Sequence, residues 1–119
     1  MRDFRQLQIW ERSHQLTLEM YKLTQEFPVE ERYGLVSQMR RSSSSVPTNI
    51  AEGCGRNSEA DFARFLDHSM GSASELEYQL ILAHDLGFLP KDQFEYTSTE
   101  LIEIKKMLNA FIQKLRANH

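Results

Sequence analysis

Residues 40–58 read RRSSSSVPTNIAEGCGRNS, and this stretch holds both the most unusual segment of the chain and its central turn. Four consecutive serines are poor residues for the interior of a helix. Pro47 has no N–H to donate and crowds the carbonyl of Ser43, one turn earlier. Gly53 is available to cap the C-terminus of the helix. We therefore expect a helix over about residues 30–52 that is either kinked near Pro47 or made in two pieces.

Glycine and proline divide the rest of the chain into segments around this one. The breaks fall near residue 28, at residues 53–55 and at residues 87–90, and they leave four segments with a helical apolar period. No segment alternates as a strand would. Long helices joined by short turns pack antiparallel to their neighbours. The sequence thus predicts a single all-α domain over residues 1–119, an up-down-up-down antiparallel four-helix bundle whose second helix is kinked near Pro47.

The third segment, about residues 58–85, has clear signals at both ends. Ser58 can cap its N-terminus, and Asp61 three residues later completes an approximate capping box. Gly87 can cap its C-terminus, and Pro90 prevents the helix from continuing.

Small side chains recur inside this third segment, from Ser69 to Ser74, and include Gly71. Folding the second and third segments together about the glycine turn places this patch opposite the serine run. We therefore expect the two helices to cross closely there.

The first segment, about residues 6–27, carries two apolar stripes at helical spacing. The stripe that we expect to face the core contains Leu7, Trp10, His14, Leu18 and Tyr21. The other stripe contains Ile9, Leu16, Met20, Leu23 and Phe27. Two apolar faces are more than one bundle requires, so the second stripe either lies deep in the protein's own core or packs on another subunit. The candidate subunit-interface residues are accordingly Ile9, Leu16, Met20 and Leu23.

Composition excludes several classes of protein. A hydrophobic content of 40% with 26% charged residues is that of an ordinary globular domain, so a disordered or fibrous chain is excluded. A single cysteine cannot form an internal disulfide, and the first residues show no secretory leader, so we expect a cytoplasmic protein. No apolar run approaches the roughly 18 residues that span a bilayer, so we expect no membrane partner.

Charge is distributed unevenly around a net value of −3. Residues 57–104 contain ten acidic and two basic residues, whereas residues 32–56 and 105–119 are each net positive. A strongly basic nucleic-acid protein carries its excess charge over the whole domain. Binding of nucleic acid would therefore have to use a small part of this surface.

Two features raise the question of catalysis, and both have simpler interpretations. Cys54 lies before a helix start and near Arg56, which would lower the pKa of a thiol, but no catalytic partner is near it in the sequence. Glu11 and His14 match one half of a di-iron motif that needs two Glu-x-x-His pairs. We interpret Cys54 as a turn residue and His14 as a core or interface side chain. The sequence predicts no enzyme activity, no cofactor and no metal site.

The turn over residues 53–58 resembles an anion site, because free N–H groups at a helix start and the adjacent Arg56 can hold a phosphate. It follows a helix, however, and lacks the strand and the lysine of a nucleotide-binding loop, so we interpret it as an interhelical turn. Arg40, Arg41 and Arg56 form the densest basic set, and Glu52 can pair with Arg56 four residues later. Contact with RNA and structural ion pairs at a subunit interface are both open for these arginines.

One longer pattern resembles a known family. It consists of Tyr33-Gly34-Leu35, Gln38-Met39-Arg40-Arg41, and above all Asn49-Ile50-Ala51-Glu52-Gly53 followed by Gly55-Arg56. These residues resemble the four-helix bundle protein family, also called the 23S rRNA-intervening sequence proteins. The resemblance covers nearly the whole chain, through Leu7, Trp10, Phe27-Pro28, Phe65-Leu66, Gly71-Ser72, Glu75-Leu76 and Gln79-Leu80.

The resemblance implies a homo-oligomeric ring, expected to be a pentamer. Family members are encoded within inserts in ribosomal RNA genes or act as accessory proteins of diversity-generating retroelements. The expected function is therefore that of a non-enzymatic accessory factor associated with RNA or a ribonucleoprotein, and the alternative is a protein–protein interaction scaffold that binds no nucleic acid. The residues expected to contact RNA or another subunit are Arg40, Arg41, Asn49, Glu52 and Arg56. Four further cations expected to contribute to RNA binding are Lys105, Lys106, Lys114 and Arg116.

Overall fold

The computed structural model describes residues 2–117, and all regular secondary structure in that range is helical. The four α-helices are α1 (Gln8–Thr24), α2 (Leu35–Cys54), α3 (Glu59–Asp85) and α4 (Lys91–Ala117). Short 3-10 helices precede the first two, η1 at Phe4–Gln6 and η2 at Val29–Glu31. The predicted all-α class with four principal helices is confirmed.

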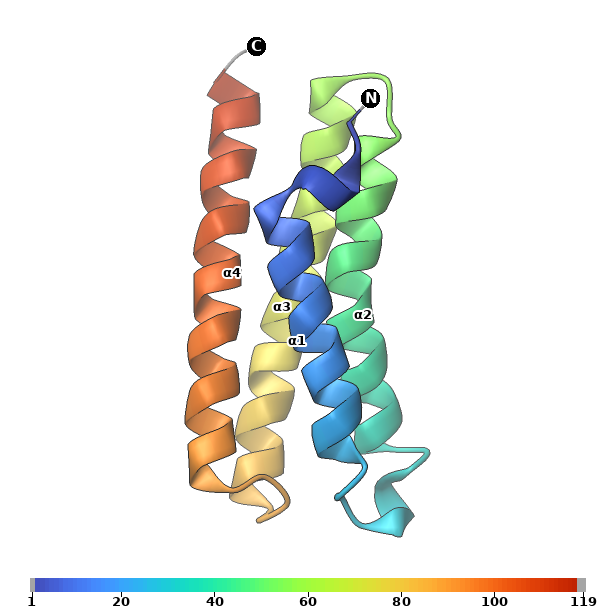
Figure 1. Ribbon diagram of the computed structural model, residues 1–119, viewed down its shortest axis with the longest axis vertical. Coiled ribbons are helices and arrows are strands. Elements are labelled where there is room, and N and C mark those ends of the chain that lie inside the picture. The colour runs from blue at the N-terminus through green and yellow to red at the C-terminus, as the bar shows by residue number, and fades with distance from the viewer. Residues whose placement is uncertain (1, 118–119) are drawn as a thin grey trace.

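The helices lie side by side along one long axis (Figure 1). In that view α1 and α3 run in one direction, and α2 and α4 run in the other. α1 packs against α2 and α4, and α3 packs against the same two helices. The bundle measures 47 × 22 × 20 Å. The α1–α2 edge and the α3–α4 edge are therefore opposite sides of the molecule.

All four helices contribute side chains to one apolar core. Complete burial of an aliphatic side chain stabilises the fold by about 1.5–3 kcal/mol relative to exposure. Fully buried aliphatic side chains come from every helix and include Met20, Ile50, Leu66, Leu76, Leu80, Leu101, Ile104 and Leu108. No helix within residues 2–117 combines the length and the apolar character needed to cross a membrane.

α2 passes through Pro47 as one continuous α-helix. The expected alternative of a helix in two pieces is therefore excluded, while the kink near Pro47 stays a prediction. The carbonyl of Ser43 would normally accept from the N–H of residue 47, which proline lacks. The Thr17 hydroxyl on α1 donates to this carbonyl instead, at 2.9 Å. A side chain of the neighbouring helix thus replaces the missing helical donor.

The serine run on either side of this point uses its hydroxyls locally. Each hydroxyl donates to a carbonyl three or four residues earlier in α2. Such bonds satisfy the hydroxyls within the helix itself. The Ser42 hydroxyl is also 2.6 Å from the amide oxygen of Gln79 on α3.

Both ends of α3 are capped as the sequence predicts. The Ser58 hydroxyl accepts from the N–H of Asp61 at 3.1 Å. At the other end Gly87 has φ +83°, a left-handed conformation that favours glycine. The N–H of Gly87 donates to His84, and that of Phe88 donates to Ala83, which is the Schellman arrangement of a helix C-terminus.

Gly53 has a different role from the predicted C-terminal cap, because α2 continues to Cys54. A Cβ atom on Gly53 would lie 2.7 Å from Cδ1 of Phe62 and 3.0 Å from Cβ of Phe65. Glycine is needed there so that α2 and α3 can approach each other closely. Ser69 makes a second close contact, since its hydroxyl donates to the Val46 carbonyl at 2.8 Å. Gly71 takes no part in this crossing, because it is exposed and a Cβ atom there would meet nothing within 4 Å.

Candidate functional site

Apolar and aromatic side chains are exposed along the edge where α1 meets α2. Leu18 is 50% exposed and Tyr21 is 45% exposed. Beside them lies an open hollow of about 620 Å³, and its lining residues come from both helices. We use the term α1–α2 face for the residues Trp10, His14, Leu18, Tyr21, Ser44, Pro47, Thr48 and Ala51.

The part of this face near the start of α1 has two stacked aromatic rings. The rings of Trp10 and His14 lie parallel, with centroids 5.0 Å apart and an interplanar angle of 10°. Phe4 also contacts the Trp10 ring in an edge arrangement, with centroids 5.0 Å apart. A partly exposed aromatic pair therefore lies at this surface, and aromatic side chains have few rotatable bonds to fix when they contact a partner.

The structure corrects the sequence-based assignment of the two α1 stripes. Ile9, Leu16, Met20 and Leu23, predicted as interface candidates, are only 0–8% exposed and belong to the protein's own core. Of the other stripe, predicted to face the core, Leu7 and Trp10 are partly buried against it, whereas Leu18 and Tyr21 are exposed on the α1–α2 face.

Small hydroxyl residues explain why the stripe through Leu16 is the buried one. Ser13, Thr17 and Thr24 lie on the buried side of α1. The Ser13 and Thr24 hydroxyls donate to carbonyls of α1 itself, and the Thr17 hydroxyl shares its one hydrogen between the Ser43 carbonyl at 2.9 Å and the Ser13 carbonyl at 3.0 Å. These short side chains let α1 approach the serine run of α2, where the Thr17 hydroxyl reaches the Ser43 carbonyl. The spacing of the three residues, next to the stripe through Leu16, is a sequence signal for this arrangement that apolar residues alone do not reveal.

Arg40 is tied to α1 and does not project freely. Its Nε donates to the Thr24 hydroxyl at 2.9 Å, and its Nη2 donates to the Tyr21 carbonyl at 3.2 Å. The guanidinium also lies over the Tyr21 ring, 4.7 Å from the centroid. The neighbouring Arg41 is exposed, and no hydrogen bond or ion pair of its side chain is present among residues 2–117. Of this pair, Arg41 has a guanidinium with no partner among residues 2–117, whereas Arg40 has two of its N–H groups engaged.

The other candidates lie toward the C-terminal end of α2 or in the turn that follows it. Asn49 donates its side-chain amide to the Ser45 carbonyl at 2.8 Å, so it is used within the helix. Arg56 pairs with Glu52 at 3.5 Å and lies over the Phe65 ring. Arg56 lies beyond the end of α2 at Cys54, and the part of the helix between Arg40 and that end rises by about 21 Å. The structure therefore brings Glu52 and Arg56 together but does not place Arg40 and Arg56 in one basic patch.

The basic residues predicted on α4 divide in the same way. Lys105 donates to Glu77 on α3 at 2.7 Å, and Arg116 pairs with Asp67. Lys106 and Lys114 are exposed, and neither has an ion pair within the described part of the chain. Two of the four basic residues predicted on α4 are therefore engaged in ion pairs within the chain.

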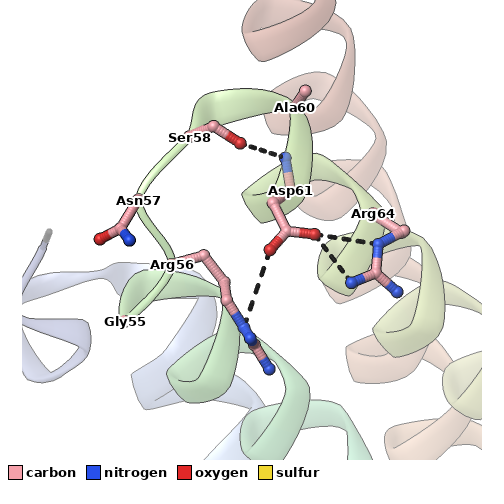
Figure 2. A pocket seen from close by; sticks show the side chains of 7 residues that line it. All are labelled: Gly55, Arg56, Asn57, Ser58, Ala60, Asp61 and Arg64. Carbon is pink, nitrogen blue, oxygen red and sulfur yellow. Dashed lines mark hydrogen bonds and ion pairs between the residues drawn. The ribbon is translucent and has the colours of Figure 1, made fainter.

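The turn between α2 and α3 forms a second hollow, of about 520 Å³ (Figure 2). Asp61 points into it between two guanidinium groups. Its carboxylate lies 3.9 Å from Nε of Arg56 and accepts from Nη2 of Arg64 at 2.7 Å. A carboxylate of the chain itself therefore occupies the position that an external anion would take. This geometry favours an interhelical turn over a phosphate site.

Cys54 is buried, and its backbone carbonyl accepts from the N–H of Arg2 at 3.1 Å. Burial raises the pKa of the Cys54 thiol, an effect that the nearby Arg2 charge only partly offsets. A raised pKa keeps the sulfur protonated at neutral pH, which is the opposite of an activated nucleophile. The geometry thus favours a packing role for this thiol.

The Glu11 and His14 pair shows no metal-binding arrangement. His14 is stacked on Trp10, and Glu11 accepts a hydrogen bond from Gln15 at 3.1 Å. Within residues 2–117, no three His, Cys, Asp or Glu side chains are grouped so that they could hold a metal ion.

Comparisons with known proteins identify relatives of the chain. Residues 5–110 match the family model described as 23S rRNA-intervening sequence protein. The structure is similar to the crystal structure of a protein of unknown function from the S23 ribosomal protein family of Bacteroides thetaiotaomicron, with a TM-score of 0.77 and 28% sequence identity. That similarity covers 87% of this chain and 97% of the other. None of the curated proteins matches the chain.

Proposed function

The chain belongs to the 23S rRNA-intervening sequence protein family, and from this premise we propose that it is a non-enzymatic protein that assembles with copies of itself through the α1–α2 face. The observation that carries the proposal is the exposure of Leu18 and Tyr21 beside a 620 Å³ hollow. Exposed apolar patches of this kind mark interaction sites, and Trp and Tyr contribute most to binding energy there. Burying this face would remove its apolar surface from water.

A closed ring of five, the stoichiometry that the family resemblance implies, requires a heterologous contact. In a five-fold ring each copy uses one surface toward its left neighbour and a different surface toward its right neighbour. The opposite edge of the bundle offers a second apolar surface, where Tyr78, Ile81 and Ile102 are exposed. A hollow of about 330 Å³ lies next to Ile102, between α3 and α4. We use the term α3–α4 face for Met70, Tyr78, Ile81 and Ile102.

Light scattering coupled to size exclusion tests the assembly directly. We expect a mass of about five times the 13.9 kDa of one chain. A monomer at micromolar concentration would refute self-association, whereas a dimer or tetramer would refute only the ring of five.

A pair of charge variants tests which faces meet. Leu18→Lys should block the α1–α2 face, and Ile102→Lys should block the α3–α4 face. If the contact is heterologous, each variant alone is monomeric, but a mixture of the two forms a heterodimer through the one intact pair of faces. If the α1–α2 face pairs with itself, Ile102→Lys still associates without a partner, and the two-face arrangement is wrong.

An accessory role with RNA or a ribonucleoprotein is the second candidate function. It is supported by the family description and by a structural neighbour in the S23 ribosomal protein family. On this chain the free cations that could contact phosphate include Arg41, Lys106 and Lys114. A ring would repeat this small set on every copy and so gather enough phosphate contacts for useful affinity. RNA binding would then depend on assembly of the ring. A ring that binds no RNA would instead act as a protein–protein interaction scaffold.

A further inference from the structure

A third hollow, of about 260 Å³, lies where the end of α1, η2 and the start of α2 come together. Its apolar lining includes Phe27, Val29 and Val36, of which Phe27 and Val36 are buried. The charged residues that line it are two arginines, Arg32 and Arg40. We call it the Arg32–Arg40 hollow. An apolar floor combined with two positive charges is the usual composition of a site for a small ligand with an acidic group.

Arg40 is held in position before any ligand arrives. Two of its five N–H groups are used, one on the Thr24 hydroxyl and one on the Tyr21 carbonyl. Thr24 is itself fixed, because its hydroxyl donates to the Met20 carbonyl at 2.7 Å. The Tyr21 ring supports the guanidinium plane from one side. The remaining N–H groups are therefore pre-oriented, and binding them costs little side-chain entropy.

Arg32 supplies the second charge with no internal partner. It is exposed at the end of η2, and its guanidinium makes no ion pair or hydrogen bond within residues 2–117. The nearby Glu31 forms no ion pair with Arg32, and its carboxylate accepts a hydrogen bond from the N–H of Leu35 at 3.2 Å. Two cations thus adjoin one apolar hollow, and neither is paired with a carboxylate.

We propose that the Arg32–Arg40 hollow binds a small organic carboxylate with a compact apolar tail. The carboxylate would accept from the two guanidinium groups, in the planar geometry that arginine favours. The tail would lie on Phe27 and Val36. The hollow, of about 260 Å³ and open to solvent, has room for a molecule of about nine heavy atoms.

Ligand-observed NMR on the full-length protein tests this proposal with three probes. Benzoate has the size, the charge and the apolar part, benzamide has the same shape without the charge, and inorganic phosphate has charge without an apolar part. We expect saturable binding of benzoate, with benzamide and phosphate each at least ten-fold weaker. Absence of saturable benzoate binding up to about 10 mM, near the weakest affinity expected for so small a ligand, would overturn the proposal.

Two arginine variants decide where the probe binds. Arg32→Gln removes an exposed charge with no contact in the fold and should weaken benzoate binding at least ten-fold. Arg41→Gln is the matched control, because Arg41 is equally free but does not line the hollow, and it should change the affinity less than two-fold. Equal effects of the two substitutions, or no effect of Arg32→Gln, would show that benzoate responds only to overall charge and would overturn the site. Circular dichroism confirms that both variants are folded.

Discussion

The hydroxyl of Thr17 on α1 donates a 2.9 Å hydrogen bond to the carbonyl of Ser43 on α2, the carbonyl that Pro47 leaves without its helical donor. A proline in a helix interior costs about 3 kcal/mol or more, in part through this lost bond. In this bundle the neighbouring helix supplies the donor. Proline is therefore tolerated at this position because α1 is docked beside it.

Replacing Thr17 by valine should destabilise the protein by about 1–3 kcal/mol, because the buried Ser43 carbonyl would lose its donor while the side-chain volume stays the same. Chemical denaturation at a fixed protein concentration measures the change, since assembly would otherwise alter the apparent stability.

The Pro47→Ala background isolates the cause of that effect. Alanine restores an N–H that can donate to Ser43, so Thr17→Val should cost clearly less in this background than in the wild type. A double-mutant cycle gives the coupling between the two positions. If both backgrounds respond equally, the hydroxyl of Thr17 does not substitute for the missing proline donor.

Gly53 and Gly71 should respond to alanine in opposite directions. At Gly53 the new Cβ would overlap the Phe62 ring, so we expect a loss of about 1–2 kcal/mol. At Gly71 the Cβ has open space within a helix, so alanine should stabilise by about 0.5–1 kcal/mol. Thermal unfolding of both variants makes the comparison, and a stabilised Gly53→Ala would show that α2 and α3 can separate without cost.

A lysine at position 18 should reduce the molecular mass without unfolding the chain, because Leu18 is half exposed on the α1–α2 face. Lysine at Tyr96, which is also an exposed helical position but lies outside both faces, is the control and should leave the mass unchanged. Lysine at Leu16 should instead unfold the protein, because that side chain is buried in the core. Light scattering and circular dichroism together distinguish the three outcomes.

The buried thiol of Cys54 should make stability depend on pH in the alkaline range. Its pKa is raised in the folded protein, so the unfolded chain loses this proton first, at about pH 8.5. The contribution is fully present below that pH and is lost as the pH rises through the folded-state pKa. Cys54→Ala should remove this part of the alkaline decline. If wild type and variant decline in parallel between about pH 8 and 10, the thiol is not perturbed.

If the protein binds RNA, the salt dependence of binding should identify the contacts. Arg41→Gln should reduce the slope of log affinity against log salt, because each phosphate contact contributes about one unit per site. Arg56→Gln should change it little, since Arg56 is already paired with Glu52 and Asp61. Filter binding of an RNA fragment over a salt series supplies the slopes. No binding at about 50 mM salt would favour the protein scaffold.

Much of the fold could be predicted because local signals agree with the final packing. Ser58 caps α3 through Asp61, and Gly87 ends it in the left-handed conformation. Both residues act within one turn of their own position, so their roles follow from sequence spacing alone. The beginning of α2 was placed too early, because η2 and the turn that follows it have the composition of a helix.

The orientation of α1 could not be predicted in the same way. The spacing of apolar residues marks two stripes on α1 equally well. Which stripe is buried depends on the side chains of the neighbouring helix that it meets. Ser43 and Thr17 decide it, because close approach of two helices needs small side chains on both. The predicted basic site failed for a related reason: most of the length of α2 lies between Arg40 and the turn that holds Arg56, and other side chains engage both guanidinium groups.

The weak helical propensity of the serine run implies that α2 is completed late in folding, when its neighbours are in contact with it. α3 and α4 are long helices with favourable ends, whereas residues 42–47 gain their helical form largely from contacts with α1 and α3. Substitutions at Thr17 and at Val46 should then slow refolding to a similar degree, which stopped-flow kinetics can measure. Completion of α2 and docking of α1 would be a single kinetic event, so the surface used for assembly would appear only in chains that have already reached the native packing.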